Sequence, residues 1–371
     1  MKFVCTKENI EKSLGLVSPI AGKQGNLPIL QHVYITAGES GVELVTTNLE
    51  VAMTVTLRAK VDVPGSFTVP AKTLSDFIRL LPEEQITFSV EGSELIIKSG
   101  SSGTKVKGSP ADDFPVIPPP EGDYTYTLGT GALRDGLSRV AIAVARNEMR
   151  PELSGVSCQF FSELFPGVVF AATDSYRLAE SRVDVLQGKD TMSCIIPMST
   201  VQEINRALVG EKAGEAVQIW VTDNQISFRF GDVELSSRLI QGTYPDYRQI
   251  VPESFSTVAT LPKSDFTQKI KAASLFTSTS TPAVSIDVQQ SSGIVTISSM
   301  SSQMGEHNAS VDAEIEGDEN SVLLNHRYLL DGLAQIKTDD IVFKMNSGDA
   351  PCMLTPKNTD RYFYIVMPIR Q

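Results

Sequence analysis

The segment Val69-Pro-Ala-Lys-Thr-Leu-Ser-Asp-Phe-Ile78 places a proline at the start of an apolar pattern with helical spacing. Two similar segments follow, Ile196-Pro-Met-Ser-Thr-Val-Gln-Glu-Ile204 and Leu324-Asn-His-Arg-Tyr-Leu-Leu-Asp-Gly-Leu333; their aligned positions 70, 197 and 325 lie 127 and 128 residues apart. Proline is favoured in the first turn of a helix, where its missing N–H removes no hydrogen bond. A recurrence at one period indicates repeated domains.

Each of these segments is preceded by another helical pattern. Its apolar positions are Ile10, Leu14 and Val17, then Leu133, Leu137 and Val140, then Phe266, Ile270 and Ala273. Each segment is also followed by two short alternating runs, which predict antiparallel strands: 85–90 with 94–98, 217–221 with 225–230, and 340–344 with 353–354. We therefore expect an α+β fold of three tandem domains with two helices each, comprising residues 1–123, 124–253 and 254–371. Proline-rich stretches after residues 117 and 251 are the expected linkers.

The composition limits the classes of protein to which the chain can belong. A length of 371 residues exceeds one ordinary core, and 41% hydrophobic with 20% charged residues is typical of globular proteins. The first residues, Met1 to Glu8, contain no apolar leader, and no stretch is long enough to cross a membrane. We therefore expect a cytoplasmic protein with no membrane partner. The four cysteines and three histidines are scattered, so neither a metal, a disulfide framework nor a cofactor is expected.

Charge is distributed unevenly along the chain. The net charge of −12 argues against indiscriminate binding to nucleic acid, which depends on Lys and Arg at phosphates. Basic residues nevertheless gather on or beside the expected helices, whereas acidic residues gather in turns such as 312–319. A solvated helix face would show the same pattern, but so would helices that all turn toward one anionic surface. The basic residues in question are Lys7, Lys12, Lys72, Arg79, Arg134, Arg139, Arg206, Lys263, Lys269, Lys271, Arg327 and Lys337.

The central segment Thr173-Asp-Ser-Tyr-Arg-Leu-Ala179 follows a strand-like apolar run and has the residue types of a functional site. A hydrolase that uses Ser175 with Asp174 and a histidine is one interpretation. The chain has no GxSxG motif, however, and adjacent residues of a strand point to opposite faces. It also has no GxxxxGK[ST] motif for a nucleotide. We therefore expect a binding protein rather than an enzyme.

The chain resembles the bacterial DNA polymerase III β subunits, the sliding clamps. The resemblance extends from end to end and rests on the three domains together with four motifs: Asn26-Leu-Pro-Ile-Leu30, Thr173 to Ala179, Tyr244-Pro-Asp-Tyr-Arg248 and Tyr364-Ile-Val-Met-Pro-Ile-Arg370. It implies a head-to-tail homodimer, a ring of six domains with helices inside and sheets outside. Such a ring would encircle double-stranded DNA without reading its sequence and tether the replicative polymerase for processive synthesis.

The resemblance also implies a pocket between the second and third domains that binds short peptide motifs of polymerases, the clamp loader and repair factors. Apolar residues of the pocket would bury a partner's side chains, and an arginine would meet a carbonyl or carboxylate. Tyr176 replaces a histidine that many relatives have before the arginine. The matching positions are Leu153, Thr173, Ser175, Tyr176, Arg177, Leu178, Pro245, Arg248, Ile250, Tyr328, Ile365, Val366, Met367, Pro368, Ile369 and Arg370. We expect the last strand to end near Ile365, with the remaining residues forming a wall of the pocket.

Two further sets follow from the resemblance. Ring closure is expected to use Thr104, Lys105 and Val106 against Ser274, Leu275 and Phe276. The residues expected to face DNA are Lys7, Lys12, Lys23, Gln24, Lys72, Arg79, Arg134, Arg139, Arg146, Arg150, Arg206, Lys263, Lys271 and Arg327. A three-domain scaffold that binds peptides without encircling DNA would share the fold. It differs from a clamp in whether the basic helix residues face one channel.

Overall fold

The computed structural model of the chain describes residues 1–22, 27–82, 84–146, 149–163, 165–209, 215–278 and 282–369. The chain packs as two compact units. Unit 1 consists of residues 1–131, 185–189 and 202–239, and unit 2 consists of residues 132–184, 190–201 and 240–371. The largest sheet of each unit contains strands from both sides of an expected linker. The three domain boundaries expected from the sequence stay a prediction.

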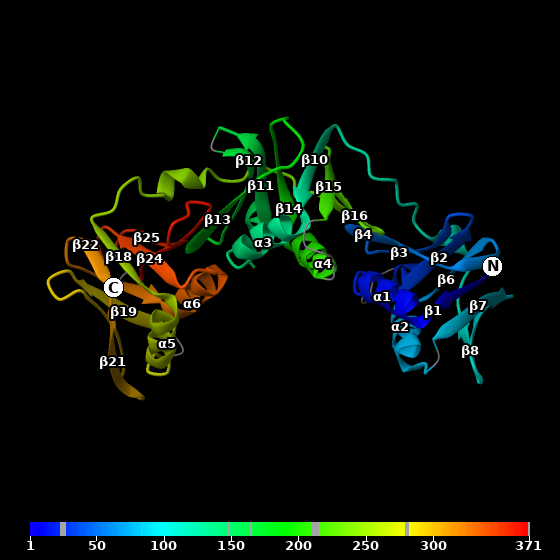
Figure 1. Cartoon of the computed structure of the whole chain (residues 1–371), viewed down its shortest axis with the longest axis horizontal. Coiled ribbons are helices and arrows are strands. Elements are labelled where there is room, and N and C mark those ends of the chain that lie inside the picture. Colours follow the sequence, from blue (N-terminus) through cyan, green and yellow to red (C-terminus); the bar gives the residue numbers. More distant parts are fainter. Residues whose placement is uncertain are drawn as a thin grey trace. The chain divides into compact units, whose positions relative to one another are not determined.

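Unit 1 contains two antiparallel sheets (Figure 1). The five-stranded sheet has the order β5 (Lys60–Val63), β1 (Lys2–Thr6), β7 (Gln85–Glu91), β8 (Glu94–Ser99) and β9 (Ser102–Lys107). The eight-stranded sheet has the order β10 (Tyr124–Gly129), β15 (Ala216–Val221), β16 (Gln225–Phe230), β17 (Val233–Arg238), β4 (Val51–Leu57), β3 (Gly41–Thr47), β2 (His32–Gly38) and β6 (Gly65–Pro70).

Unit 2 repeats this plan with a nine-stranded and a four-stranded sheet. The nine strands are ordered β14 (Met192–Pro197), β11 (Gly155–Ser162), β12 (Phe165–Thr173), β13 (Arg177–Val183), β26 (Tyr362–Val366), β25 (Cys352–Pro356), β24 (Asp340–Met345), β18 (Thr257–Pro262) and β22 (Glu314–Gly317). The four strands are β21 (Gly305–Asp312), β20 (Ile294–Ser301), β19 (Ala283–Gln289) and β23 (Asn320–Asn325). Without β22, the larger sheet read from β14 matches the eight-stranded sheet of unit 1 read from β6, so the repeat extends to topology.

The α-helices within the described ranges lie where the apolar spacing predicts them. Each of the three repeated segments begins a helix immediately after a strand, at Ala71, Met198 or His326. The bounds are α1 (Lys7–Val17), α2 (Ala71–Leu80), α3 (Thr130–Ala141), α4 (Met198–Leu208), α5 (Lys263–Ser274) and α6 (His326–Gln335). Short 3-10 helices are η1 (Pro28–Gln31), η2 (Ala111–Asp113), η3 (Pro151–Leu153) and η4 (Tyr247–Ile250).

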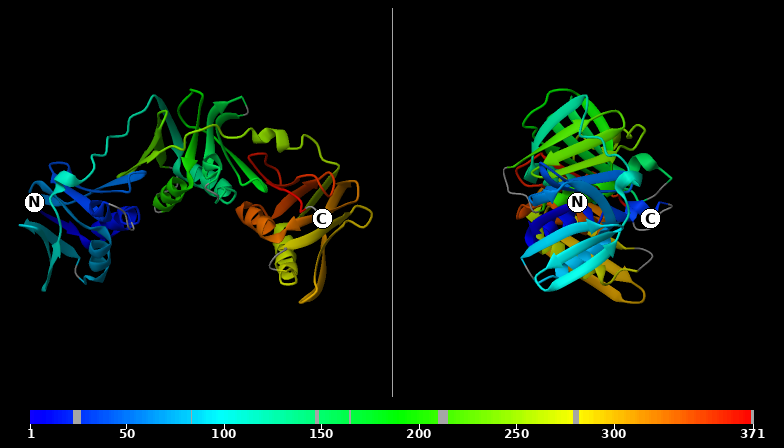
Figure 2. Two further views of the ribbon diagram at one scale, coloured as in Figure 1. Left: turned by 180° about the vertical axis from the view of Figure 1, so that it is seen from behind. Right: turned by 90° about the vertical axis from the view of Figure 1, so that its right-hand side faces the viewer.

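Paired helices cover the sheets in each unit. In unit 1, α1 and α2 lie side by side (Figures 1 and 2), and Ile10 and Leu14 of α1 are fully buried. In unit 2, α5 packs against α6, and Phe266 and Ile270 are likewise buried. Burial of one such side chain stabilises a fold by about 1.5–3 kcal/mol. The predicted apolar positions therefore form the contact between each helix pair and its sheets.

Candidate functional site

The segment from Thr173 to Arg177 forms the turn between β12 and β13. Thr173 Oγ1 donates to the Arg177 carbonyl at 2.7 Å and accepts from Ser175 N–H at 3.2 Å. Asp174 Oδ1 accepts from the backbone N–H groups of Tyr176 and Arg177, each at 3.0 Å. Ser175 has a left-handed φ of 76°. The expectation that Asp174 and Ser175 lie in a strand is therefore wrong, because both belong to an Asx-type turn.

The same turn recurs in unit 1 between β3 and β4. Thr47 Oγ1 donates to the Val51 carbonyl at 3.0 Å and accepts from Leu49 N–H at 3.0 Å. Asn48 Oδ1 accepts from the N–H groups of Glu50 at 3.0 Å and Val51 at 2.8 Å, and Leu49 also has a φ of 76°. The hydroxyl and carboxylate of Thr173 and Asp174 thus have a structural role in the repeat. With its carboxylate engaged in the turn, Asp174 is not positioned to orient a catalytic histidine.

Arg177 joins this turn to helix α6. Its side chain is only 10% exposed and lies with Nε 3.0 Å from Asp174 Oδ2 and Nη1 2.5 Å from Asp331 Oδ2. The guanidinium also lies 4.5 Å from the ring centre of Tyr328. Burial lowers the pKa of Arg177, but Tyr364, Asp331 and Asp174 together raise it above its usual value. Two of its donors thus serve carboxylates of its own unit, and the expectation that Arg177 or Arg370 meets a partner's carbonyl or carboxylate stays a prediction.

Most strand residues expected in the pocket form its buried floor. Leu178 and Ile365 are directly paired in β13 and β26 and belong to an apolar cluster with Ala171, Tyr247 and Met353. The Tyr247 hydroxyl donates to Glu180 Oε2 at 2.8 Å. Buried side chains among the expected pocket residues are those of Leu153, Thr173, Leu178, Ile365 and Val366. Their burial favours a supporting role, and their contact with a partner stays a prediction.

The residues that reach the surface of this site come from the turn, the linker and the chain end. Tyr176 is 63% exposed and Ile250 is 41% exposed. Ser175 and Arg248 are exposed, while Pro245, Tyr328, Met367, Pro368 and Ile369 are half-buried. Strand β26 ends at Val366, one residue beyond the expected Ile365, and Met367 N–H donates to the Tyr176 carbonyl at 2.9 Å. Arg370 lies outside the described residues.

Sequence reasoning missed three contributors to this floor: Ala171, Glu180 and Met353. Tyr247 was part of the motif Tyr244 to Arg248, but its inward direction was not visible from that motif. Tyr244 also fixes the turn, because its hydroxyl accepts from Thr173 N–H at 3.0 Å. Burial raises the pKa values of Tyr244 and Tyr247, so both remain neutral hydrogen-bonding groups.

Three cations expected to face DNA instead cap helix ends. Lys7 Nζ donates to the carbonyls of Arg79 at 3.2 Å and Leu81 at 2.5 Å, at the C-terminal end of α2. Lys263 Nζ makes the equivalent bond at the end of α6, to the Ile336 carbonyl at 2.7 Å. Arg206 donates to the Gly15 and Leu16 carbonyls of α1 at 2.8 and 2.6 Å. C-terminal carbonyls carry partial negative charge, which explains why these cations turn toward the helix ends. Their assignment to DNA stays a prediction.

Other members of the basic set have intramolecular partners. Arg139 stacks over the Tyr362 ring at 5.7 Å, and Arg150 Nε lies 3.0 Å from Glu152 Oε1. Arg134 Nη2 lies 3.8 Å from an oxygen of Asp135. Lys23 and Gln24 lie outside the described residues. Exposed side chains that form no ion pair with a described residue are Lys12, Lys72, Arg79, Arg146, Lys271 and Arg327.

The segments expected to close a ring are both accessible. Thr104, Lys105 and Val106 lie in β9, the edge strand of the five-stranded sheet. Leu275 follows the last residue of α5, Ser274, and is 68% exposed. Phe276 stacks on His307 with ring centres 5.5 Å apart. Each segment thus presents unpaired backbone or apolar surface suited to an interface.

In the part of the chain that the structure describes, no three His, Cys, Asp or Glu side chains are grouped so as to hold a metal ion. Across the same residues, none of the helices has the length and apolarity needed to cross a bilayer.

Three family models match consecutive parts of the chain, which are the N-terminal, central and C-terminal domains of the DNA polymerase III beta subunit over residues 1–118, 127–246 and 248–370. The beta sliding clamp of Synechocystis sp. is 28% identical over 391 residues, covering 100% of this chain and 99% of that protein. A DnaN sliding clamp from Pseudomonas aeruginosa bound to griselimycin has a TM-score of 0.94 at 25% identity, with 100% of both chains covered. A Bacillus subtilis DNA polymerase sliding clamp has a TM-score of 0.94 at 25% identity, covering 100% of this chain and 99% of that chain. The chain belongs to the family of DNA polymerase III beta subunits.

Proposed function

We propose that two copies of this chain close head to tail into a ring that encircles duplex DNA and holds the replicative polymerase on it. The observation that carries this function is the consecutive match of the three beta-subunit domains along nearly the whole chain. We place the domain boundaries near residues 123 and 253, giving six domains in the ring. The protein acts as a processivity factor rather than an enzyme and requires no cofactor. A peptide-binding scaffold without DNA encirclement is the less favoured function.

Ring closure joins the edge strand β9 of one copy to the region after α5 of the other. The open backbone groups of Thr104 to Val106 supply strand pairing, and the exposed Leu275 with the adjacent Phe276 supplies apolar area. Lys105 Nζ lies 3.6 Å from Glu94 within its own sheet, so its charge is already partly compensated. Closure then depends mainly on strand pairing and apolar burial.

Duplex DNA is held through its phosphates. Among the residues expected to face DNA, the exposed cations that form no ion pair with a described residue are Lys12, Lys72, Arg79, Arg146, Lys271 and Arg327. Each phosphate contact contributes regardless of sequence, so the path along DNA is nearly level in free energy. Processivity then follows from the closed ring, and a tethered polymerase gains a high effective concentration at the primer end. This role places the chain in the bacterial cytoplasm.

Partner peptides dock on the surface formed by Ser175, Tyr176, Arg248, Ile250 and residues 367–369. Tyr176 and Ile250 offer exposed apolar surface, and the flexible Met367 accommodates side chains of different shapes. Replicative polymerase, the clamp loader, other polymerases and repair factors are the expected partners. They reach this surface through short linear motifs.

Retention on DNA of different topology tests the function. The protein is loaded on nicked circular DNA by a bacterial clamp loader with ATP, then separated by gel filtration before and after the circle is cut. A clamp remains bound to the circle and leaves the linear product through its free ends. Equal retention on both forms would refute encirclement.

A further inference from the structure

Unit 1 contains a structural counterpart of the partner site of unit 2. The turn Thr47 to Val51 matches the turn Thr173 to Arg177 bond for bond, as described above. The next strand also matches: Arg238 N–H donates to the Glu50 carbonyl at 2.9 Å, just as Met367 N–H donates to the Tyr176 carbonyl at 2.9 Å. Strand β17 therefore stands beside β4 as β26 stands beside β13.

The side chains on these matching strands and on the linker that follows differ between the two units. The strand registers align Leu178, Met353 and Ile365 of unit 2 with Ala52, Ser227 and Ser236 of unit 1. The linker motifs align Tyr247 with Ile117. These four replacements in unit 1 are smaller, and two are polar, whereas the fifth cluster member, Ala171, aligns with the larger Val45. At this place unit 1 has a cavity of about 580 Å³, and Val45, Ala52, Ile117 and Ser236 are among the residues that line it.

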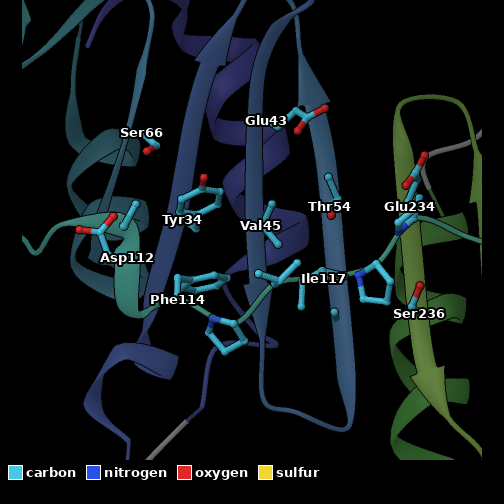
Figure 3. Close-up of a pocket in the computed structure, with 16 residues that line it drawn as sticks. Tyr34, Glu43, Val45, Thr54, Ser66, Asp112, Phe114, Ile117, Glu234 and Ser236 are labelled. Carbon is cyan, nitrogen blue, oxygen red and sulfur yellow. The ribbon is translucent and has the colours of Figure 1, made fainter.

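Residues 111–119 form one side of this cavity, which we call the linker groove. Figure 3 shows Phe114 and Ile117 lying across the strands that carry Tyr34, Val45 and Thr54. Phe114 stacks on Tyr34 with ring centres 5.2 Å apart. Val116, which also lines the groove, is 92% exposed. The groove therefore combines apolar surface with a partly polar floor.

The charged groups of the linker groove are acidic. Glu43 and Asp112 are exposed, lie at different edges of the groove in Figure 3, and form no ion pair with any residue in the described ranges. The third lining carboxylate, Glu234, is already bound to Arg229, whose Nε lies 2.7 Å from Glu234 Oε1. The two open carboxylates leave the groove with a negative charge that a cationic occupant would compensate.

We propose that the linker groove is a second docking site, which binds a short basic segment of a protein partner. Apolar side chains of that segment pack on Val116 and Ile117. Its Lys or Arg side chains extend toward Glu43 and Asp112, where a charge-assisted hydrogen bond is stronger than a neutral one. This site differs in charge from the surface around Tyr176 and operates independently of it, so one chain can hold two partners of different sequence.

Fluorescence polarisation with two labelled hexapeptides tests the proposal on the full chain. The basic probe is Gly-Leu-Lys-Val-Arg-Leu, and the matched probe replaces Lys and Arg with Glu. At low ionic strength the basic probe binds about tenfold more tightly, a difference of about 1.4 kcal/mol that two exposed charge pairs together can supply. The double variant Glu43→Gln with Asp112→Asn abolishes this preference. Val116→Ser, at a position that is 92% exposed, weakens both probes without disturbing the fold.

Two control variants identify where the probe binds. Asp76→Asn with Glu91→Gln removes the same charge from exposed positions of unit 1 outside the groove and leaves the affinity unchanged. Tyr176→Ala alters the surface of unit 2 and also leaves it unchanged. The proposal is overturned if the two probes bind with equal affinity. It is also overturned if the charge control loses the preference for the basic probe as the groove variant does, or if Tyr176→Ala weakens binding of the probe. None of these results bears on retention of the ring on circular DNA.

Discussion

Replacement of Arg177 by Ala tests whether this residue organises the partner site from within. The guanidinium is 10% exposed and forms ion pairs with Asp174, which is 16% exposed, and Asp331, which is 49% exposed. Loss of the mostly buried guanidinium leaves the negative charge of Asp174 uncompensated, which destabilises the fold. The pair with the half-exposed Asp331 contributes little to stability. With the lost stacking on Tyr328 included, we expect the free energy of unfolding of unit 2 to fall by about 2–4 kcal/mol.

This loss corresponds to a decrease in Tm of about 4–16 °C for a unit of this size. Thermal unfolding is followed by far-UV circular dichroism, and hydrogen exchange of residues 173–178 reports loosening of the turn directly. Binding of a polymerase-derived peptide weakens as well, while the dimer mass from light scattering stays constant. Asp331→Asn is the matched control, since it removes only the exposed pair and lowers Tm by a few degrees at most.

Unchanged stability and exchange in Arg177→Ala, combined with lost peptide affinity, would contradict the internal role. That result would instead identify the guanidinium as a direct contact with the peptide.

Three further predictions concern the interface, DNA and pH. The double variant Leu275→Ala with Phe276→Ala yields monomers in sedimentation velocity, and a dimer persisting at nanomolar concentration would refute the interface. Lys271→Ala changes two residues per ring, and each phosphate contact contributes about 0.9 to the slope of log K against log salt. The magnitude of this slope therefore falls by about 2. Arg206→Ala is the control, which lowers Tm and leaves the slope unchanged. Burial lowers the pKa of His32 below its unfolded value of about 6.5, so its stabilisation is complete above that pH and is lost as the pH falls. His32→Gln therefore reduces the drop in Tm between about pH 7.5 and 5.5, and an identical drop in both proteins would exclude this histidine as its source.

The helices and most strands were predictable from the sequence because their signals are local. Ile10, Leu14 and Val17 recur at helical spacing, and that spacing alone predicts the buried face of α1. The division into units was not predictable in the same way. It depends on backbone pairing across the linkers, such as Ser237 with Val51, which leaves no trace in either strand taken alone.

The candidate site was predictable in position but not in the direction of its side chains. Thr173 and Arg177 belong to a polar segment that the sequence marks as a candidate site. In the structure, their side chains form hydrogen bonds within the turn. The unit 1 turn at Thr47 to Val51 has the same Thr-Asx pair but lacks the Tyr-Arg pair that follows in unit 2. This recurrence indicates that the Thr-Asx pair has a structural role. The Thr-Asx pair that the two turns share maintains the turn, whereas Ser175 and Tyr176, which align with Leu49 and Glu50, are exposed.

Some basic residues on the helices contribute little charge to the surface, because they bind the ends of neighbouring helices. Lys7 and Lys263 occupy the first position of α1 and α5, where the end of a neighbouring helix presents unpaired carbonyls. A lysine there satisfies those carbonyls and loses little hydration, because its chain is long enough to reach them from the surface. Its charge is partly neutralised by the helix dipole and contributes weakly to the field at a distance. The repeated position of these two residues therefore reflects the stability of each helix pair, and we expect phosphate contacts from exposed residues such as Lys271.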